Sequence, residues 1–215
     1  MHDYLEATPT IESGHPRIRT LASELAGRCA NEREKAVNLF RFVRDEIRYN
    51  IFMISMVEED FRASFILEAS KGYCVQKAIL LCALGRAAGI PTRLVLARIK
   101  NHRIPSKLYE RLGRDVFPAH GYNQFYLDGQ WLSAAATFDS ALCERVGVPV
   151  VDFDGIQDAV LPAAALDGGP YIEYLEHFGT YADLPLKWIV ERTSKIWGVD
   201  KRAWLSPQDD PDHGA

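Results

Sequence analysis

The sequence predicts a domain of mixed helices and strands built around one buried helix. Between Gly72 and Gly89 the chain is apolar on nearly every side of a 3.6-residue repeat, which is typical of a helix with neighbours all round. Residues 92–99 have the length and β-branched content of a strand, and two more strand-like runs, 121–127 and 130–137, are joined by Asp-Gly. Asp-Gly between two such runs is the strongest short-range signal for a β-hairpin.

Two helices precede the central one, and smaller elements follow the hairpin. Asn31 followed by Glu34 has the form of a capping box, so the second helix begins there and keeps one apolar stripe as far as Ile47. The segment 49–57 is apolar and partly β-branched, which fits either a strand or an irregular covering segment. The other expected elements are a helix over 16–28, a short helical turn within 61–69, a short helix over 107–112, small elements at 148–153 and 171–175, and a helix over 184–197.

Composition indicates one globular domain over residues 1–205, with a disordered Pro/Asp-rich tail over 206–215. A formal charge of −4 and the lack of a dense Lys/Arg cluster argue against a nucleic-acid partner. No apolar run is long enough to span a membrane, and we expect no signal peptide. Four widely spaced cysteines without a CxxC predict neither disulfides nor a metal site, so we expect a reducing cytoplasm and no cofactor.

Cys74 lies in the first turn of the central helix. Unpaired N–H groups and the positive end of the helix dipole stabilise a thiolate there. Cys82, two turns further along among Leu and Ala, is predicted to be core. The alternative interpretation of Cys74 is that it is also a core residue, because a cysteine near an apolar run is often a small buried hydrophobe.

His120 comes directly before the first hairpin run and is the best-placed imidazole. A cysteine at a helix start and a histidine on a neighbouring strand are the minimum for an activated thiol, because the imidazole takes the thiol proton and returns it to the leaving group. The alternative is a strand-edge histidine without a catalytic role. The weaker candidates are terminal, precede a proline or lie in polar loops: His2, His15, His102, His177 and His213.

Three separated motifs, in order along the chain, resemble the core of the transglutaminase-like superfamily. They are Gly72-Tyr73-Cys74 at a helix start, the helix end Arg86-Ala-Ala-Gly-Ile-Pro-Thr-Arg93, and His120 followed by Tyr126-Leu-Asp-Gly-Gln-Trp131. The run Arg44-Asp-Glu-Ile-Arg-Tyr49 is also similar to the family, so the resemblance covers about residues 35–140. It implies an α+β, papain-like fold whose nucleophile helix packs on an antiparallel sheet, with 141–205 as a C-terminal extension. In such a fold Cys74 would be the nucleophile and His120 the base.

The sequence departs from the family where the third catalytic residue is expected. The family's acid stands four residues after the hairpin tryptophan, and that place is Ala135 here. Asp139 has the same strand parity and would be a diagonal neighbour of His120, about 7–8 Å away between backbones. We therefore predict Asp139 as the third member of the triad, the alternative being a helix cap or turn residue. Asn123 is a poor substitute because odd-numbered residues point to the opposite face of the sheet.

The resemblance implies acyl transfer through a thioester at Cys74, with a peptide, amide or thioester as substrate, which a carrier protein could deliver. Hydrolysis is expected first and transfer to an amine second. The backbone N–H of Cys74 is the expected oxyanion donor. Tyr73 and Tyr122 are candidate cleft residues, the alternative for both being packing in the core. The alternatives are a catalytically impaired domain that binds a peptide or protein, and a structural scaffold subunit. A cluster of aspartates at 152, 154 and 158 lacks the closing Glu of an EF-hand and predicts a turn.

Overall fold

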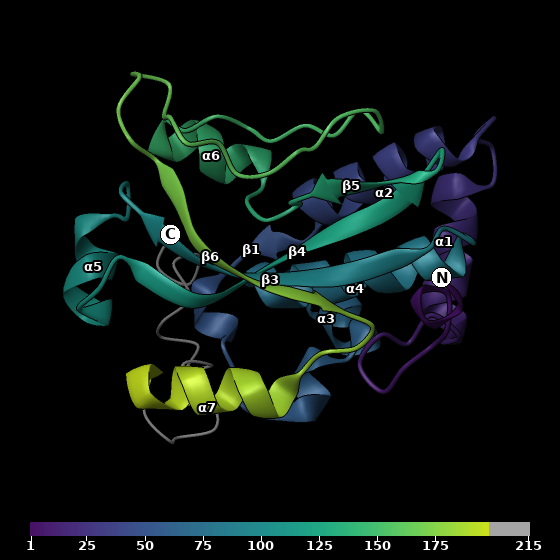
Figure 1. Cartoon of the computed structure of the whole chain (residues 1–215), viewed down its shortest axis with the longest axis horizontal. Helices are drawn as coiled ribbons and strands as arrows, with labels where there is room; N and C mark the ends of the chain where they lie inside the picture. Colours follow the sequence, from purple (N-terminus) through teal and green to yellow (C-terminus); the bar gives the residue numbers. More distant parts are fainter. Residues whose placement is uncertain (198–215) are drawn as a thin grey trace.

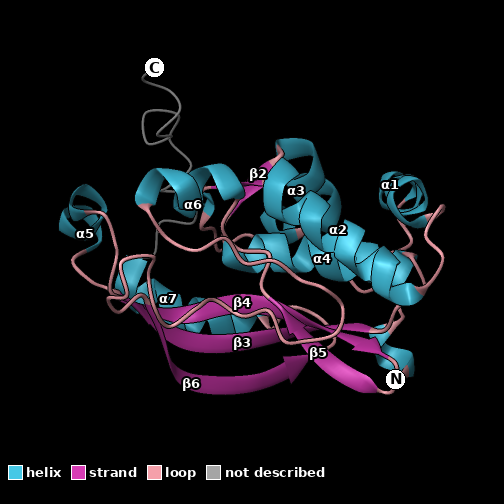
Figure 2. Ribbon diagram, turned by 90° about the horizontal axis from the view of Figure 1, so that it is seen from above, coloured by secondary structure: helices cyan, strands magenta, loops and turns pink. Residues whose placement is uncertain are grey.

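The computed structural model describes residues 1–197, in which helices gather beside an antiparallel sheet (Figure 1, Figure 2). The helices are α1 (Pro16–Ala26), α2 (Glu32–Glu46), α3 (Ala63–Ala69), α4 (Cys74–Ala87), α5 (Ser106–Leu112), α6 (Ser140–Val146) and α7 (Leu186–Trp197), with short 3₁₀ helices η1 (His2–Tyr4), η2 (Ile51–Met53) and η3 (Glu58–Phe61). The strands are β1 (Arg48–Tyr49), β2 (Lys71–Gly72), β3 (Thr92–Asn101), β4 (Val116–Leu127), β5 (Gln130–Ala134) and β6 (Ile172–Tyr181). The α+β class is confirmed. None of the described helices is long and apolar enough to cross a membrane.

The main sheet has the order β5-β4-β3-β6, with every neighbouring pair antiparallel. The hairpin between β4 and β5 is confirmed, with Asp128 (φ 47°) and Gly129 (φ 86°) both left-handed, as a type I′ turn requires. β6 pairs with β3 alone, and its register shifts twice along that pairing. A separate two-residue parallel pair, β1 and β2, places Tyr49 beside Gly72 and so brings η2 next to the start of α4.

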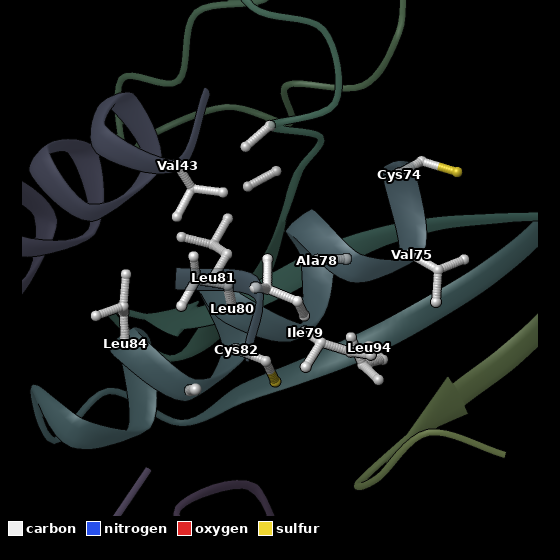
Figure 3. Packing of buried hydrophobic residues seen from close by; sticks show 14 of the residues in the cluster. Val43, Cys74, Val75, Ala78, Ile79, Leu80, Leu81, Cys82, Leu84 and Leu94 are labelled. Carbon is white, nitrogen blue, oxygen red and sulfur yellow. The ribbon is translucent and has the colours of Figure 1, made fainter. Parts of the chain in front are cut away.

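The central helix α4 is buried along its length and packs on β3 and β4 (Figure 3). Cys82 is fully buried, as predicted, with its sulfur 3.2 Å from the carbonyl oxygen of Thr92. Gly85 allows this close approach, because a Cβ there would clash with the hydroxyl of Thr92. Gly89 has the predicted left-handed conformation just after the helix, with φ 82°.

Two predicted elements differ from the structure, and the tail prediction cannot be compared. β4 begins at Val116, so His120 lies within the strand and not before it. The small element expected at 171–175 is the start of the ten-residue strand β6, which is mostly exposed and carries charged residues and a glycine between its apolar ones. The segment 49–57 is largely the irregular cover that was one of its two alternatives. The predicted disordered tail, 206–215, lies outside the described residues.

Lys77 is fully buried in the apolar helix, which the sequence pattern did not predict. Its Nζ donates to the carbonyl oxygen of Arg44 at 2.9 Å and also to that of Ile47, at the C-terminal end of α2. The last carbonyls of a helix lack partners within the helix and carry partial negative charge, so Lys77 caps α2 from inside the core. Burial lowers the pKa of Lys77 to about 7, while the carboxylates of Asp139 and Asp45 raise it.

We predict that Lys77→Met lowers the free energy of unfolding by about 3 kcal/mol, since each buried acceptor left unpaired costs roughly 1–3 kcal/mol. Urea denaturation followed by circular dichroism measures the change. Lys187→Met, at an exposed position on α7, is the control and should stay within about 0.5 kcal/mol of wild type. Equal stability of the two variants would show that the internal cap is dispensable.

Candidate active site

Cys74 is the first residue of α4, and the start of this helix is fixed by buried hydrogen bonds. The side chain of Gln76 accepts the N–H of Tyr73 at 3.2 Å and donates to the carbonyl oxygen of Asp60 at 2.8 Å. Gln76 is 0% exposed, so these bonds are shielded from water. Figure 3 shows the sulfur of Cys74 pointing away from the packed core, whereas that of Cys82 lies within it.

Beyond the hairpin, β4 has an open edge. β5 pairs with β4 only as far as Ala134, opposite Asn123. The chain then turns away, and the N–H of Ala135 donates to the carbonyl oxygen of Ala159 at 2.8 Å. The N-terminal half of β4 therefore has β3 on one side and no paired strand on the other among the described residues.

The sulfur of Cys74 lies against this open edge. Tyr126 donates its N–H to Pro91, beside β3, so the backbone groups of even-numbered β4 residues point toward β3 and those of odd-numbered residues away from it. The carbonyl oxygen of Ala119 lies 4.0 Å from the sulfur, and the N–H of Gly121 also points to it. The thiol thus occupies the place that a continued β5 would fill.

Gly121 permits this approach of α4 to the strand. A Cβ at Gly121 would lie 2.8 Å from Cα of Val75, which is backbone and cannot turn aside. The side chain of Asn123 extends the same contact, donating from Nδ2 to the carbonyl oxygen of Ala78 at 2.8 Å. Odd-numbered β4 residues therefore face α4, and even-numbered ones lie on the other face, as the sequence predicts for Asn123 and His120.

A cavity of about 420 Å³ opens at the thiol, and both Cys74 and His120 line it. Its walls come from η2, the end of β3, α5, the beginning of β4 and α6. Tyr73 and Thr137 also contribute to the lining. Tyr122, the second candidate cleft residue, does not line the cavity and packs on the sheet face beside His120.

The imidazole of His120 is 1% exposed and sits in a cluster of aromatic rings. It stacks on Tyr122 with centroids 6.0 Å apart and meets the edge of Tyr174 at 5.9 Å. The hydroxyl of Tyr122 lies 3.4 Å from Nδ1 of His177, an exposed residue of β6. Burial lowers the pKa of His120 to about 3, and His177 adds to the effect, so the imidazole is neutral near pH 7.

In the described part of the chain, no carboxylate bonds to Nε2 of His120. Its Nε2 is buried and has no hydrogen-bond partner among the described residues. Ala135, which stands at the family's acid position, is buried in the cluster that includes Tyr122 and Tyr174. The hydroxyl of Thr137 is likewise buried without a partner in the described part of the chain. The chain thus has an alanine at the family's acid position and an unsatisfied hydrogen-bonding atom, Nε2, on His120.

Asp139 has the alternative role that the sequence left open. One carboxylate oxygen accepts the N–H of Leu142 at 2.9 Å and so caps α6, and the other accepts the N–H of Tyr49 at 2.9 Å. Neither oxygen contacts Nε2 of His120. Asp139 therefore joins α6 to the cavity wall at Tyr49, and the geometry gives no support to its predicted place in a triad.

Burial raises the pKa of the Cys74 thiol to about 11. The backbone N–H groups of Gly121, Val75 and Cys74 itself act in the opposite direction without outweighing it. The thiolate expected at the helix start is therefore not the resting form. Thiol and imidazole are therefore both neutral near pH 7.

Sequence reasoning missed Gln76, Gly121 and the walls contributed by α5 and α6. A glycine directly after the candidate base was the available signal for Gly121, since glycine in a strand often marks a close backbone approach. The described residues contain no group of three or more His, Cys, Asp or Glu side chains placed to hold a metal ion. Asp154 accepts the N–H groups of Ile156 and Gln157, which makes the predicted turn.

Comparison with known proteins shows that residues 19–136 match the transglutaminase-like superfamily. A crystal structure of a candidate cysteine protease from Cytophaga hutchinsonii shares the fold, with a TM-score of 0.50 at 16% identity over 83% of this chain and 53% of that one. The periplasmic domain of TgpA from Pseudomonas aeruginosa gives a TM-score of 0.47 at 23% identity, over 66% of this chain and 48% of that one. The chain thus spans about half the length of these structures. No curated protein sequence matches.

We predict that alkylation of Cys74 by iodoacetamide accelerates about tenfold per pH unit from pH 6 to pH 10 without a plateau, because the pKa of the thiol is raised to about 11. Peptide mass spectrometry separates Cys74 from the other cysteines, and Cys74→Ala verifies the assignment. A plateau below pH 8.5 would show instead that the thiolate forms in the resting protein.

Proposed function

The chain belongs to the transglutaminase-like superfamily, and on that premise we propose that it is a cysteine-dependent acyl-transfer enzyme. Cys74 attacks the carbonyl carbon of an amide, ester or thioester and becomes acylated. His120 takes the thiol proton and delivers it to the leaving group. Both residues are assigned from the matched motifs and from their position on one cavity.

The observation that carries the proposal is the placement of the Cys74 sulfur. It lies at the start of a buried helix, against the open edge of β4, at a cavity that His120 also lines. The N–H groups of Cys74 and Gly121 lie beside the sulfur, next to the place where the oxygen of an attacked carbonyl would take up negative charge. Two backbone donors at that point are the arrangement of an oxyanion hole, and we propose Gly121 as the second donor.

Water is the proposed acyl acceptor, which makes the enzyme a peptidase or amidase, with transfer to an amine as the second outcome within the same chemistry. The fold shared with a candidate cysteine protease supports the first choice. The substrate is a peptide, amide or thioester, free or attached to a carrier protein. We also propose a reducing cytoplasm, because Cys29, Cys74, Cys82 and Cys143 are all free.

A second function, a catalytically impaired domain that binds a peptide or protein, is favoured by one observation. Ala135 leaves Nε2 of His120 without a partner among the described residues, and the resting thiol and imidazole are both neutral. An imidazole without an orienting acid loses orders of magnitude in rate, although residual catalysis persists. Acylation of Cys74 distinguishes the two functions.

The proposed function predicts a covalent adduct. Intact-mass spectrometry of the full chain, offered a panel of simple amides, esters and thioesters, should show one added acyl group that Cys74→Ala abolishes. His120→Gln should retain the fold and slow acylation by about 100-fold or more, the usual contribution of a general base. Added amines that shorten the lifetime of the adduct would reveal transfer in addition to hydrolysis.

A folded protein that forms no Cys74-dependent adduct with any member of the panel would contradict the enzyme. The binding domain would then be the better description.

Ala135→Asp should restore a carboxylate beside Nε2 of His120. The new negative charge next to the imidazole raises the pKa of His120, and a neighbouring carboxylate typically shifts a pKa by about 1–3 units. We expect the rate of Cys74 acylation at pH 7 to increase by roughly 10- to 100-fold, since one pKa unit corresponds to a factor of about ten. Stopped-flow measurement of acylation gives the rate.

Ala135→Asn is the matched control, because it has the same shape without the charge and should give a smaller gain. A correctly folded Ala135→Asp protein with the wild-type rate would show that position 135 does not act on His120.

A further inference from the structure

The walls of the cavity at Cys74 are mostly apolar. Aliphatic and aromatic side chains from η2, β3, α5, β4, α6 and the segments that adjoin them surround the space, among them Ile54, Ile99, Ile104, Leu108, Phe117 and Val148. The volume of about 420 Å³ falls within the range of about 300–1,000 Å³ that is usual for small-molecule sites. Cys74 is itself a lining residue, so a group held in the cavity lies beside the thiol.

The charged groups of the cavity are all of one sign. Arg103 and Arg145 are lining residues, and no Asp or Glu is among the described residues that line it. Arg103 is paired with Asp167 at 2.5 Å and donates to the carbonyl oxygen of Pro170 at 3.2 Å. A cationic side chain in the cavity would find no carboxylate among the described lining residues, so it would lose its hydration without gaining an ion pair there.

We propose that this cavity is an acyl-chain subsite that selects a neutral, apolar acyl group for transfer to Cys74. The inference rests on the proposed function and deepens it, because it names the substrate class as an apolar acyl donor. An extended chain of several methylenes matches the apolar walls, and a cationic chain of the same length does not.

With a simple ester as the acyl donor, the reaction at this site needs only the ester, the thiol and water. The Cys74 sulfur forms a bond to the carbonyl carbon, the bond from that carbon to the alcohol oxygen breaks, and His120 transfers the thiol proton to the departing oxygen. Water then adds to the thioester carbonyl, the carbon–sulfur bond breaks, and the free carboxylic acid and the thiol are released. No oxidant, reductant or further reactant is needed.

The test compares p-nitrophenyl esters of acetic, butyric, hexanoic and 6-aminohexanoic acid, with release of p-nitrophenol as the readout and Cys74→Ala as the background. Each methylene that enters an apolar site is worth about fourfold in rate. We expect the hexanoyl ester to acylate Cys74 roughly tenfold or more faster than the acetyl ester. The 6-aminohexanoyl ester, which has nearly the same length, should react no faster than acetate.

Leu108→Trp fills the cavity from the half-buried wall of α5 and should remove the rate advantage of the hexanoyl ester over the acetyl ester. Tyr109→Trp, the next residue on α5, lies outside this cavity, is exposed, and should change neither rate. Val146→Trp provides the same narrowing from the exposed end of α6, in case the first variant does not fold.

Binding measured without chemistry separates this inference from the proposed function. Saturation-transfer NMR should detect hexanamide on the wild-type protein, and neither acetamide nor 6-aminohexanamide, with the signal lost in Leu108→Trp. Hexanamide binding without any acylation of Cys74 supports the subsite and overturns the enzyme. Acylation with equal rates for the acetyl and hexanoyl esters overturns the subsite alone. The same conclusion follows if Leu108→Trp and Val146→Trp both keep the wild-type preference for the hexanoyl ester. If the protein neither binds hexanamide nor becomes acylated at Cys74, both the subsite and the proposed function are overturned.

Discussion

The contact between the first turn of α4 and the backbone of β4 sets the position of everything in the site. It exists because Gly121 has no side chain, which lets Val75 lie directly against the strand. The helix is held in that place by buried polar groups near both of its ends, with Gln76 and Lys77 in the first turn and Arg86 in the last. A buried hydrogen bond has no water to replace it if it breaks, so these contacts fix the helix in one position. The sulfur therefore meets the open strand edge with little freedom.

The electrostatics of the site follow from the same burial. Removing Cys74 and His120 from water moves the two pKa values apart, to about 11 and about 3, and so favours the uncharged pair. In a triad a carboxylate counters this effect on the histidine, and Ala135 provides none. The predicted acid, Asp139, joins α6 to Tyr49 instead. Under the proposed function, the fold would hold Cys74 and His120 in place and leave their activation to a substrate that enters the cavity.

The features that the sequence predicted well are those whose cause is local. Asp128-Gly129 accepts left-handed backbone without strain, and Asn31 bonds to the N–H of Glu34 three residues away, so neither depends on the rest of the chain. The partners of Lys77 lie 30 or more residues away along the chain, and no periodicity reveals them. Asp139 shows the same limit, because strand parity could not show that backbone N–H groups from two other elements would occupy its oxygens. The resemblance to a family supplied the pairing of cysteine and histidine, and the chain's own departure at Ala135 became meaningful only with the unpaired Nε2 in view.

The border of the main sheet at β6 has a consequence for the behaviour of the folded protein in concentrated solution. A strand with a neighbour on one side only offers free N–H and C=O groups on the other, and such a border can recruit a second molecule and start aggregation. In β6 the two register shifts and the left-handed Gly179 break the regular spacing of those groups. The charged, exposed side chains of Glu173 and Glu176 make an incoming strand less favourable still. The irregularity of β6 therefore disfavours edge-to-edge stacking at this border, which β3 separates from the hairpin.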